Sequence, residues 1–299
     1  MLAIVIPYYK ITFFEKVLKS LANQTDKRFN VYIGNDASPE NPEELLEKYK
    51  GKFDFVYHKF NNNLGSISLV RQWDRCIELM NDEKWLMILG DDDELSEGTV
   101  AAFYQNLDAI DRNKSNVVRF STQIVDNIRG RVSKVFTHPK LEKASDSYYR
   151  KFSRESRSSL SEHIFRTKIY KKYKFKNYPL AWFSDDYAWL EFAEIFPIYS
   201  INEALVFINV STESLTGNVN NLIEKNNAEI MFYNDLINHH QKDFNSFQLG
   251  KIVLQTEIAL REYRKMTFTE WVKLSKIYIT NFLVFSFLKL IRRFVINYF

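Results

Sequence analysis

Short apolar runs alternate with segments of helical periodicity along the first hundred residues. The apolar runs predict four buried strands, at residues 3–6, 29–33, 53–57 and 85–89, and Pro7 is expected to end the first of them. Apolar positions three and four residues apart predict helices at residues 14–21, 42–49 and 69–80. Strands that alternate with helices form a parallel sheet with helices on both faces, so this region predicts an α/β fold.

The pattern becomes less regular after the fourth predicted strand. Further strands are predicted at residues 117–121, 132–136, 164–166 and 205–208, and a helix at 185–196. The polar, basic run 140–159 predicts a long surface loop or a pair of short helices, and from about residue 219 the periodicity is helical. We therefore predict a boundary near Gly217, between an α/β domain at 1–217 and a helical region at 218–299.

Charge is unevenly distributed over a chain whose net charge is only +4. Residues 143–176 hold 11 basic and 3 acidic side chains, a local charge of +8. Residues 265–299 hold 6 basic and 1 acidic side chains, a local charge of +5. These basic segments indicate anionic partners such as phosphates or lipid headgroups, although a solvated surface explains each of them equally well.

Other features of the composition narrow the class of protein. The single cysteine, Cys76, excludes an internal disulfide and fits a reducing cytosol. The first nine residues do not resemble a signal peptide, and no stretch reaches the ~18 uncharged apolar residues that a membrane-spanning helix needs. No glycine-rich dinucleotide motif or P-loop follows the first strand, which disfavours dehydrogenases and P-loop enzymes. We therefore expect a cytoplasmic protein of another class.

Three consecutive carboxylates, Asp91, Asp92 and Asp93, follow the fourth predicted strand. Ligands of parallel α/β sheets bind beyond the carboxyl ends of the strands. Adjacent carboxylates repel one another and are costly to bury without a counter-ion, and Mg2+ or Mn2+ is the cation that suits such oxygen ligands. The alternative is a helix N-terminus, which explains one aspartate rather than three. The triplet therefore predicts a metal site.

Two further acidic motifs are candidates for a site. Asp36 follows the second strand, where it either binds a nucleobase or ribose or bonds its own backbone in a turn. Ser184 is predicted to cap a helix, which places Asp185 and Asp186 in its first turn. The helix dipole is expected to lower the pKa of both carboxyl groups, so that one is available as a general base, although a purely capping role is the alternative.

In their order along the chain, these motifs resemble the family 2 glycosyltransferases of the GT-A fold. The resemblance covers residues 2–215. It rests on the segments IVIPYY at 4–9, LKSLANQT at 18–25, NDAS at 35–38, NNNLG at 61–65, QWDRC at 72–76, ILGDDD at 88–93 and SDDY at 184–187. It implies a Rossmann-like, mostly parallel sheet with helices on both faces, followed by a C-terminal helical extension.

The resemblance also implies a role for each residue of the nucleotide and metal sites. Pro7 and Tyr9 are expected to line the nucleotide pocket, and Asp36 to bind the base or ribose. The metal-binding DxD pair is expected to be Asp91 and Asp93, with Asp93 the closest ligand, and Asp92 is expected near the ribose or sugar.

Asp186 is expected to be the catalytic base, with Asp185 as its neighbour. The family often has Glu-Asp here, so the shorter Asp185 leaves the base assignment open between the two. The family also often has Asp-Asp-Gly-Ser where this chain has NDAS at 35–38, so the base pocket differs.

The activity implied by the resemblance is metal-dependent, inverting transfer of a sugar, without a covalent intermediate. The donor is expected to be a UDP-sugar and the acceptor a hydroxyl of a glycan or a lipid-linked glycan, in polysaccharide or glycolipid synthesis. No nucleic-acid partner is expected. The alternatives are a nucleotidyltransferase and a catalytically silent protein that binds sugar nucleotides.

The C-terminal segment carries a separate prediction. Residues 277–288 contain no charge, and Lys289, Arg292 and Arg293 follow. On a helix, Ser286, Lys289, Arg293 and Asn297 share one face and nearly all other positions are apolar. The segment is too short to span a bilayer, so we expect peripheral contact with the inner face of the cell membrane. Packing onto the catalytic domain or a second copy is the alternative.

Overall fold

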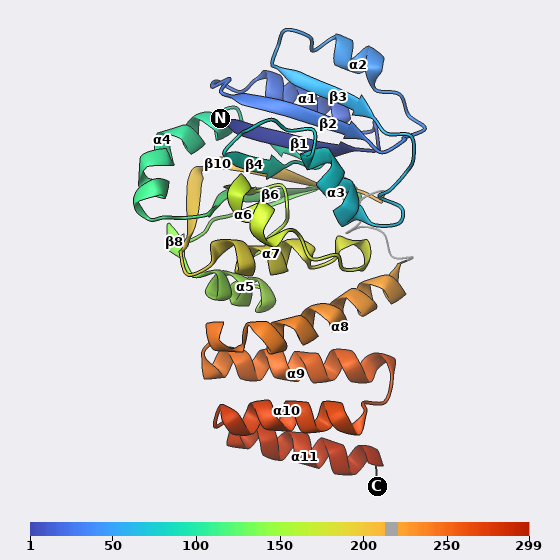
Figure 1. The fold of residues 1–299 in the computed structure, drawn as a ribbon, viewed down its shortest axis with the longest axis vertical. Helices are drawn as coiled ribbons and strands as arrows, with labels where there is room; N and C mark the ends of the chain where they lie inside the picture. Colours follow the sequence, from blue (N-terminus) through green and yellow to red (C-terminus); the bar gives the residue numbers. More distant parts are fainter. Residues whose placement is uncertain (213–220, 299) are drawn as a thin grey trace. The chain divides into compact units, whose positions relative to one another are not determined.

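The computed structural model describes residues 1–212 and 221–298, which belong to two compact units (Figure 1). The first unit covers residues 1–220 and the second covers 221–299, and the boundary predicted near Gly217 falls outside the described residues. The strands of the first unit are β1 (Leu2–Tyr8), β2 (Phe29–Asn35), β3 (Phe55–Lys59), β4 (Trp85–Ile88), β5 (Glu94–Leu95), β6 (Val117–Asp126), β7 (Arg131–Phe136), β8 (Leu141–Glu142), β9 (His163–Arg166) and β10 (Ile198–Val210). Its helices are α1 (Phe14–Ala22), α2 (Glu43–Glu47), α3 (Leu69–Ile77), α4 (Thr99–Arg112), α5 (Ala144–Phe152), α6 (Thr167–Tyr173), η1 (Pro179–Ala181) and α7 (Ser184–Ala193).

The strands form a single ten-stranded sheet within the described part of the first unit. Its order is β3-β2-β1-β4-β9-β6-β10-β5, with β7 beside β6 and β8 beside β10. Strands β3, β2, β1 and β4 are parallel, as the alternating pattern predicts. Beyond β4 the sheet is mixed, because β9 is antiparallel to β4 and β6 whereas β10 is parallel to β6. The predicted α/β class with C-terminal helices is confirmed.

Both faces of the central strands are buried, which explains why their apolar runs are continuous. On one face, Ile4 and Ile6 of β1 belong to a core with Val17 of α1 and Phe103 of α4. On the other face, α3 packs against β1 and β2 (Figure 1). An aromatic cluster that joins β9 to α7 consists of Phe165, Phe175, Trp189 and Phe192.

Three local predictions are corrected by the structure. Strand β1 continues through Pro7 to Tyr8, because Pro7 lies beyond the last pair with β4 and needs no N–H on that side. The run 140–159 holds strand β8 and the single helix α5, and is neither a long loop nor a pair of helices. The segment after Asp93 is the short strand β5, so the acidic triplet does not begin a helix.

The second unit is helical throughout its described residues. Its helices are α8 (Leu222–His239), η2 (Gln241–Asp243), α9 (Ser246–Tyr263), α10 (Phe268–Thr280) and α11 (Val284–Tyr298). A capping box of Asn245 and Gln248 begins α9, and one of Thr267 and Glu270 begins α10. Helix α9 packs against α8 and α10, and α10 packs against α11. None of the described helices has the length and apolar character needed to cross a membrane.

Candidate active site

The predicted nucleotide-pocket residues and the acidic triplet meet at the carboxyl edge of the sheet. Strands β1 and β2 end side by side, with Pro7 opposite Gly34. The backbone N–H groups of Tyr9 and Lys10 donate hydrogen bonds of 2.7 and 2.8 Å to Oδ2 of Asp91. The loop that leaves β1 is therefore held against the turn that follows β4.

The acidic triplet is also held from strand β10. The Asn209 N–H donates a 3.0 Å hydrogen bond to Oδ1 of Asp93, and the Asn209 side-chain amide donates one of 2.7 Å to the Asp92 carbonyl. A Cβ on Gly90 would lie 2.8 Å from Oδ1 of Asp92, so the turn favours glycine at this position. Asn209 was not predicted as a site residue, because the predicted strand ended at residue 208 and no local motif marks the next position.

The charge of the triplet is disfavoured by its surroundings. Burial raises the pKa of Asp91. Burial, together with repulsion from Asp93 and Asp91, raises the pKa of Asp92 to about 8. Burial also raises the pKa of Asp93 to about 6, although hydrogen bonds from Ser161 and Asn209 act in the opposite direction. Carboxylates in such surroundings gain from a nearby cation.

This turn can bind a divalent cation only if another molecule supplies the remaining ligands. Within residues 1–212 and 221–298, no three His, Cys, Asp or Glu side chains are grouped so that they could hold a metal ion. One oxygen of Asp91 and one of Asp93 already accept backbone hydrogen bonds. Since Mg2+ is commonly held by one or two carboxylates plus substrate phosphates and water, Asp91 and Asp93 fit as the protein ligands of such a site. Metal binding itself stays a prediction.

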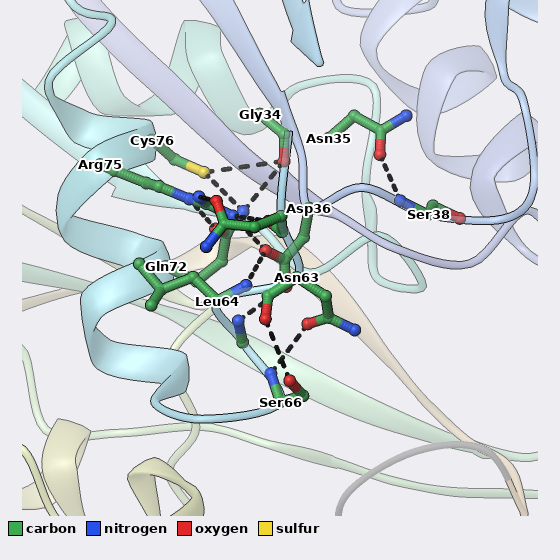
Figure 2. Close-up of polar contacts among 12 residues, drawn as sticks. Gly34, Asn35, Asp36, Ser38, Asn63, Leu64, Ser66, Gln72, Arg75 and Cys76 are labelled. Carbon is green, nitrogen blue, oxygen red and sulfur yellow. Dashed lines mark hydrogen bonds and ion pairs between the residues drawn. The ribbon is translucent and has the colours of Figure 1, made fainter. Parts of the chain in front are cut away.

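Asp36 differs from the triplet because an arginine of the chain pairs with its carboxylate (Figure 2). The Leu64 N–H donates to Oδ1 at 2.7 Å and the Gly65 N–H donates to Oδ2 at 2.8 Å. Arg75 forms an ion pair with Oδ1, and the Asp36 side chain is only 6% exposed. Asp36 therefore ties the loop 61–65 to the end of β2. Its predicted contact with the base or ribose stays a prediction.

Arg75 of α3 is a site residue that was not predicted. Its guanidinium group lies over the Phe60 ring, 3.9 Å from the ring centroid. Nη1 donates a 2.9 Å hydrogen bond to Asn62 Oδ1, and Nε donates to Gln72 Oε1. Arg75 lies in the QWDRC segment, but nothing local indicates a partner 39 residues away, at Asp36.

Asn35 and Ser38 shape the turn after β2, whereas Asp36, for which one alternative was a bond to its own turn, accepts from Leu64 and Gly65 instead. The Ser38 N–H donates to Asn35 Oδ1 at 2.8 Å, and Ser38 Oγ donates to the Tyr9 carbonyl at 2.5 Å. Ala37 adopts a left-handed φ of 52°, at the position where the resembling family often has glycine. The turn therefore keeps a glycine-like backbone without glycine.

The second carboxylate pair begins α7, but Ser184 does not cap this helix. The N-cap residue is Phe183, and Ser184 Oγ is buried without a hydrogen-bond partner among the described residues. Lys151 Nζ of α5 donates hydrogen bonds of 2.7 and 2.5 Å to the two carboxylate oxygens of Asp186. Burial and then repulsion from Asp186 raise the pKa of Asp185 to about 7, while Lys151 acts to lower it. The predicted lowering of the Asp185 pKa is wrong, because burial outweighs the helix dipole.

Some cations of the basic segment 143–176 are paired with carboxylates inside the first unit. Arg150 pairs with Glu142 at 2.6 Å, and Lys151 pairs with Asp186. Glu142 also pairs with the buried Arg119 at 2.7 Å. Arg150 and Lys151 are therefore balanced within the first unit, and an anionic partner of the rest of the segment stays a prediction.

One further ion pair connects the two carboxylate groups. Arg157 pairs with the fully buried Glu162 at 3.4 Å. Arg157 acts to lower the pKa of Asp93, whereas Glu162 acts to raise the pKa of both Asp93 and Asp185. The residues predicted as metal ligands and as the base therefore belong to one electrostatically connected region.

Comparison with known proteins identifies the same part of the chain. Residues 3–179 match the model of glycosyl transferase family 2. The S. aureus TarS structure shares 15% identity with a TM-score of 0.62, over 92% of this chain and 47% of that one, so the chain spans about half of its length. The S. aureus TarS 1-349 structure in complex with UDP-GlcNAc shares 14% identity with a TM-score of 0.65, over 92% and 79% of the two chains. At such identities the likeness establishes the fold. No curated protein matches the chain in sequence.

Proposed function

The chain belongs to glycosyl transferase family 2, and on this premise we propose that it transfers a sugar from a nucleoside-diphosphate sugar to an acceptor hydroxyl with inversion. The acidic triplet carries the proposal. Asp91, Asp92 and Asp93 are carboxylates whose charge burial disfavours, at the sheet edge where α/β proteins bind ligands. One similar structure, that of TarS 1-349, is a complex with UDP-GlcNAc, so a UDP-N-acetylhexosamine is the first donor to test.

The proposed reaction is a single displacement. The acceptor oxygen forms a bond to the anomeric carbon while the bond from that carbon to the diphosphate breaks, and Asp186 accepts the hydroxyl proton. Asp91 and Asp93 are the proposed ligands of Mg2+ or Mn2+, which when bound supplies positive charge opposite the leaving diphosphate. Pro7 and Tyr9 line the proposed nucleotide pocket.

A product assay tests the proposal and its two alternatives. The protein is incubated with UDP-GlcNAc and other nucleotide sugars, with manganese or with a chelator, and the released products are separated. We expect nucleoside diphosphate and free or transferred sugar, and loss of turnover with the chelator. Formation of nucleoside triphosphate and sugar 1-phosphate when pyrophosphate is added would indicate a nucleotidyltransferase, and binding without any turnover would indicate a silent sugar-nucleotide-binding protein.

We further propose that the second unit binds an anionic membrane surface, through α11 and the turn before it. Arg293 of α11 donates hydrogen bonds of 2.6 and 2.5 Å to Glu257 of α9. Glu257 is fully buried, so Arg293 is directed into its own unit, as is the buried Leu290. The exposed residues of α11 form the outward surface.

The outward side combines large apolar residues with cations. Phe282 and Phe285 are 89% and 83% exposed. The other exposed apolar residues of this surface are Val284, Leu288, Ile291, Val295 and Ile296. Lys289 and Arg292 are exposed on the same helix, and no acidic residue follows Glu270 in the sequence. Exposed aromatic and aliphatic side chains beside uncompensated cations suit anionic headgroups, so the proposed location is the inner face of the cell membrane, close to a lipid-linked or glycan acceptor.

Vesicle co-sedimentation tests this membrane contact. We expect the full chain to bind vesicles that contain phosphatidylglycerol, and to bind phosphatidylcholine vesicles at least about tenfold more weakly, because each cation near an anionic surface contributes about 1 kcal/mol. The double variant Phe282→Ser, Phe285→Ser should lose binding, whereas the control Phe247→Ser, which alters an exposed Phe of α9, should keep it. Unchanged vesicle binding in the double variant, or dimers that this variant abolishes, would show that another partner covers the surface.

A further inference from the structure

The proposed base is not a free carboxylate, because a lysine from another helix contacts both of its oxygens. Lys151 Nζ lies 2.7 and 2.5 Å from Oδ1 and Oδ2 of Asp186. The Asp186 side chain is 3% exposed and that of Lys151 is 28% exposed. Lys151 lies near the C-terminal end of α5, and Asp186 lies in the first turn of α7. The contact therefore joins two elements that are far apart in the sequence.

Two adjacent carboxylates lie at this helix start. Repulsion from Asp186 is one cause of the raised pKa of Asp185. Lys151 opposes this effect, since its charge acts on both of them. Among the described residues, the groups that act on this cluster are Arg157 and Glu162, and Lys151 also acts on the buried His163. Because Arg157 and Glu162 pair with each other, Lys151 is the cation that balances Asp186.

We propose that Lys151 is a positioning residue for sugar transfer, which balances the charge at the start of α7 and fixes the direction of the Asp186 carboxylate. This inference rests on the proposed function, in which Asp186 accepts the acceptor proton. A carboxylate oxygen has two lone-pair sites, so an oxygen that accepts from Lys151 keeps a site for the acceptor hydroxyl. Lys151 touches neither donor nor acceptor in this account, and acts only through Asp186.

The pH profile of kcat/KM separates this role from a structural one. Without the ammonium group, the Asp185–Asp186 pair should hold its proton to higher pH, so the acidic limb of the profile should move upward. We expect a shift of ~1 pH unit or more for Lys151→Met, with activity recovered at alkaline pH, and a limb close to the wild type for Lys151→Arg. The control Lys168→Met, which removes an exposed lysine of α6, should leave the limb unchanged.

Two further variants keep the test decisive. Lys151→Gln retains a hydrogen-bond donor without the charge and should move the limb as Lys151→Met does, which covers the case in which the methionine variant fails to fold. A limb that stays in place in Lys151→Gln while activity falls equally at every pH would overturn the inference. Asp186→Asn tests the premise separately. If Asp186→Asn keeps its turnover, the base assignment in the proposed function fails. If Asp186→Asn is inactive and the lysine variants leave the limb in place, only the role of Lys151 fails.

Discussion

Asp36 and Asp93 both lie at the carboxyl edge of the sheet, on either side of β1, but their charges are balanced in different ways. Asp36 accepts hydrogen bonds from Leu64 and Gly65 and pairs with Arg75. Asp93 is almost as buried, yet burial raises its pKa to about 6. Asp36 has an ion pair, whereas Asp93 accepts hydrogen bonds from Ser161 and Asn209 but has no ion pair among the described residues.

This difference separates structural from functional carboxylates. A buried charge that the fold compensates stabilises the fold, and its removal exposes an unpaired partner. A buried charge without compensation costs stability, so its presence at a ligand-binding edge indicates that a ligand balances it. Asp186 lies between these cases, because Lys151 balances it and yet the neighbouring Asp185 has a raised pKa.

The largest expected effect is the loss of turnover when Asp93 is replaced. Asp93→Asn should lower turnover by about 100- to 1,000-fold, because it removes a proposed ligand of the charge opposite the diphosphate. Its free energy of unfolding at neutral pH should be unchanged or higher, since the substitution removes a disfavoured charge. Nucleotide-release rates and thermal melts measure both quantities. The control Glu97→Gln alters an exposed carboxylate nearby and should change neither. A large loss of stability in Asp93→Asn would show that the Asp93 carboxylate stabilises the fold, as that of Asp36 does.

The next largest effect is the loss of turnover when Asp186 is replaced. Asp186→Asn should cut turnover by roughly 100-fold or more while donor affinity stays nearly intact, as expected for loss of a general base. Calorimetric titration with UDP and single-turnover rates separate the two quantities. A larger loss of turnover in Asp185→Asn than in Asp186→Asn would reverse the assignment of the base within the pair.

Because Arg75 balances the charge of Asp36, we expect its replacement to lower stability. Arg75→Leu leaves Asp36 buried without its cation and should lower the free energy of unfolding by about 3 kcal/mol. Arg71→Leu removes the same charge from an exposed position of the same helix and should cost less than about 0.5 kcal/mol. Urea denaturation of the two variants gives the comparison directly. Equal midpoints would show that Asp36 is not held by Arg75.

The smallest expected effect is steric. In Gly65→Ala the new Cβ would lie 2.5 Å from Oδ2 of Asp36, so the loop 61–65 must shift. We expect a loss of about 1–3 kcal/mol in the free energy of unfolding. Gly98→Ala is the control, because nothing lies within 4 Å of a Cβ there, and its cost should stay below about 1 kcal/mol. A loss in Gly65→Ala no greater than in the control would show that the loop is not tightly held.

The sequence is informative where chemistry follows from local pattern. Strands β1, β2 and β4 could be predicted because they are buried on both faces and therefore apolar throughout, and the acidic motifs follow them directly. The partners of those motifs could not be predicted. Arg75 and Lys151 reach Asp36 and Asp186 across 39 and 35 residues, and such pairings depend on how α3 and α5 pack.

The wrong prediction for the pKa of Asp185 has the same origin. The pKa of Asp185 was expected to fall because the helix start is visible in the sequence, whereas the burial that raises it is a property of the folded chain. The partner of Arg293 could not be predicted either, because it is the buried Glu257 of another helix, which periodicity alone cannot show.

Calorimetric titration of UDP, with and without manganese, tests the central claim most directly. The claim is that a cation, which also binds a nucleoside diphosphate, balances the charge of the acidic triplet. We expect manganese to strengthen UDP binding to the wild-type chain by at least about tenfold, which corresponds to ~1.4 kcal/mol, and to have no effect on binding to Asp93→Asn. An equal manganese effect in the wild type and in Asp93→Asn, or no manganese effect in the wild type, would contradict the claim.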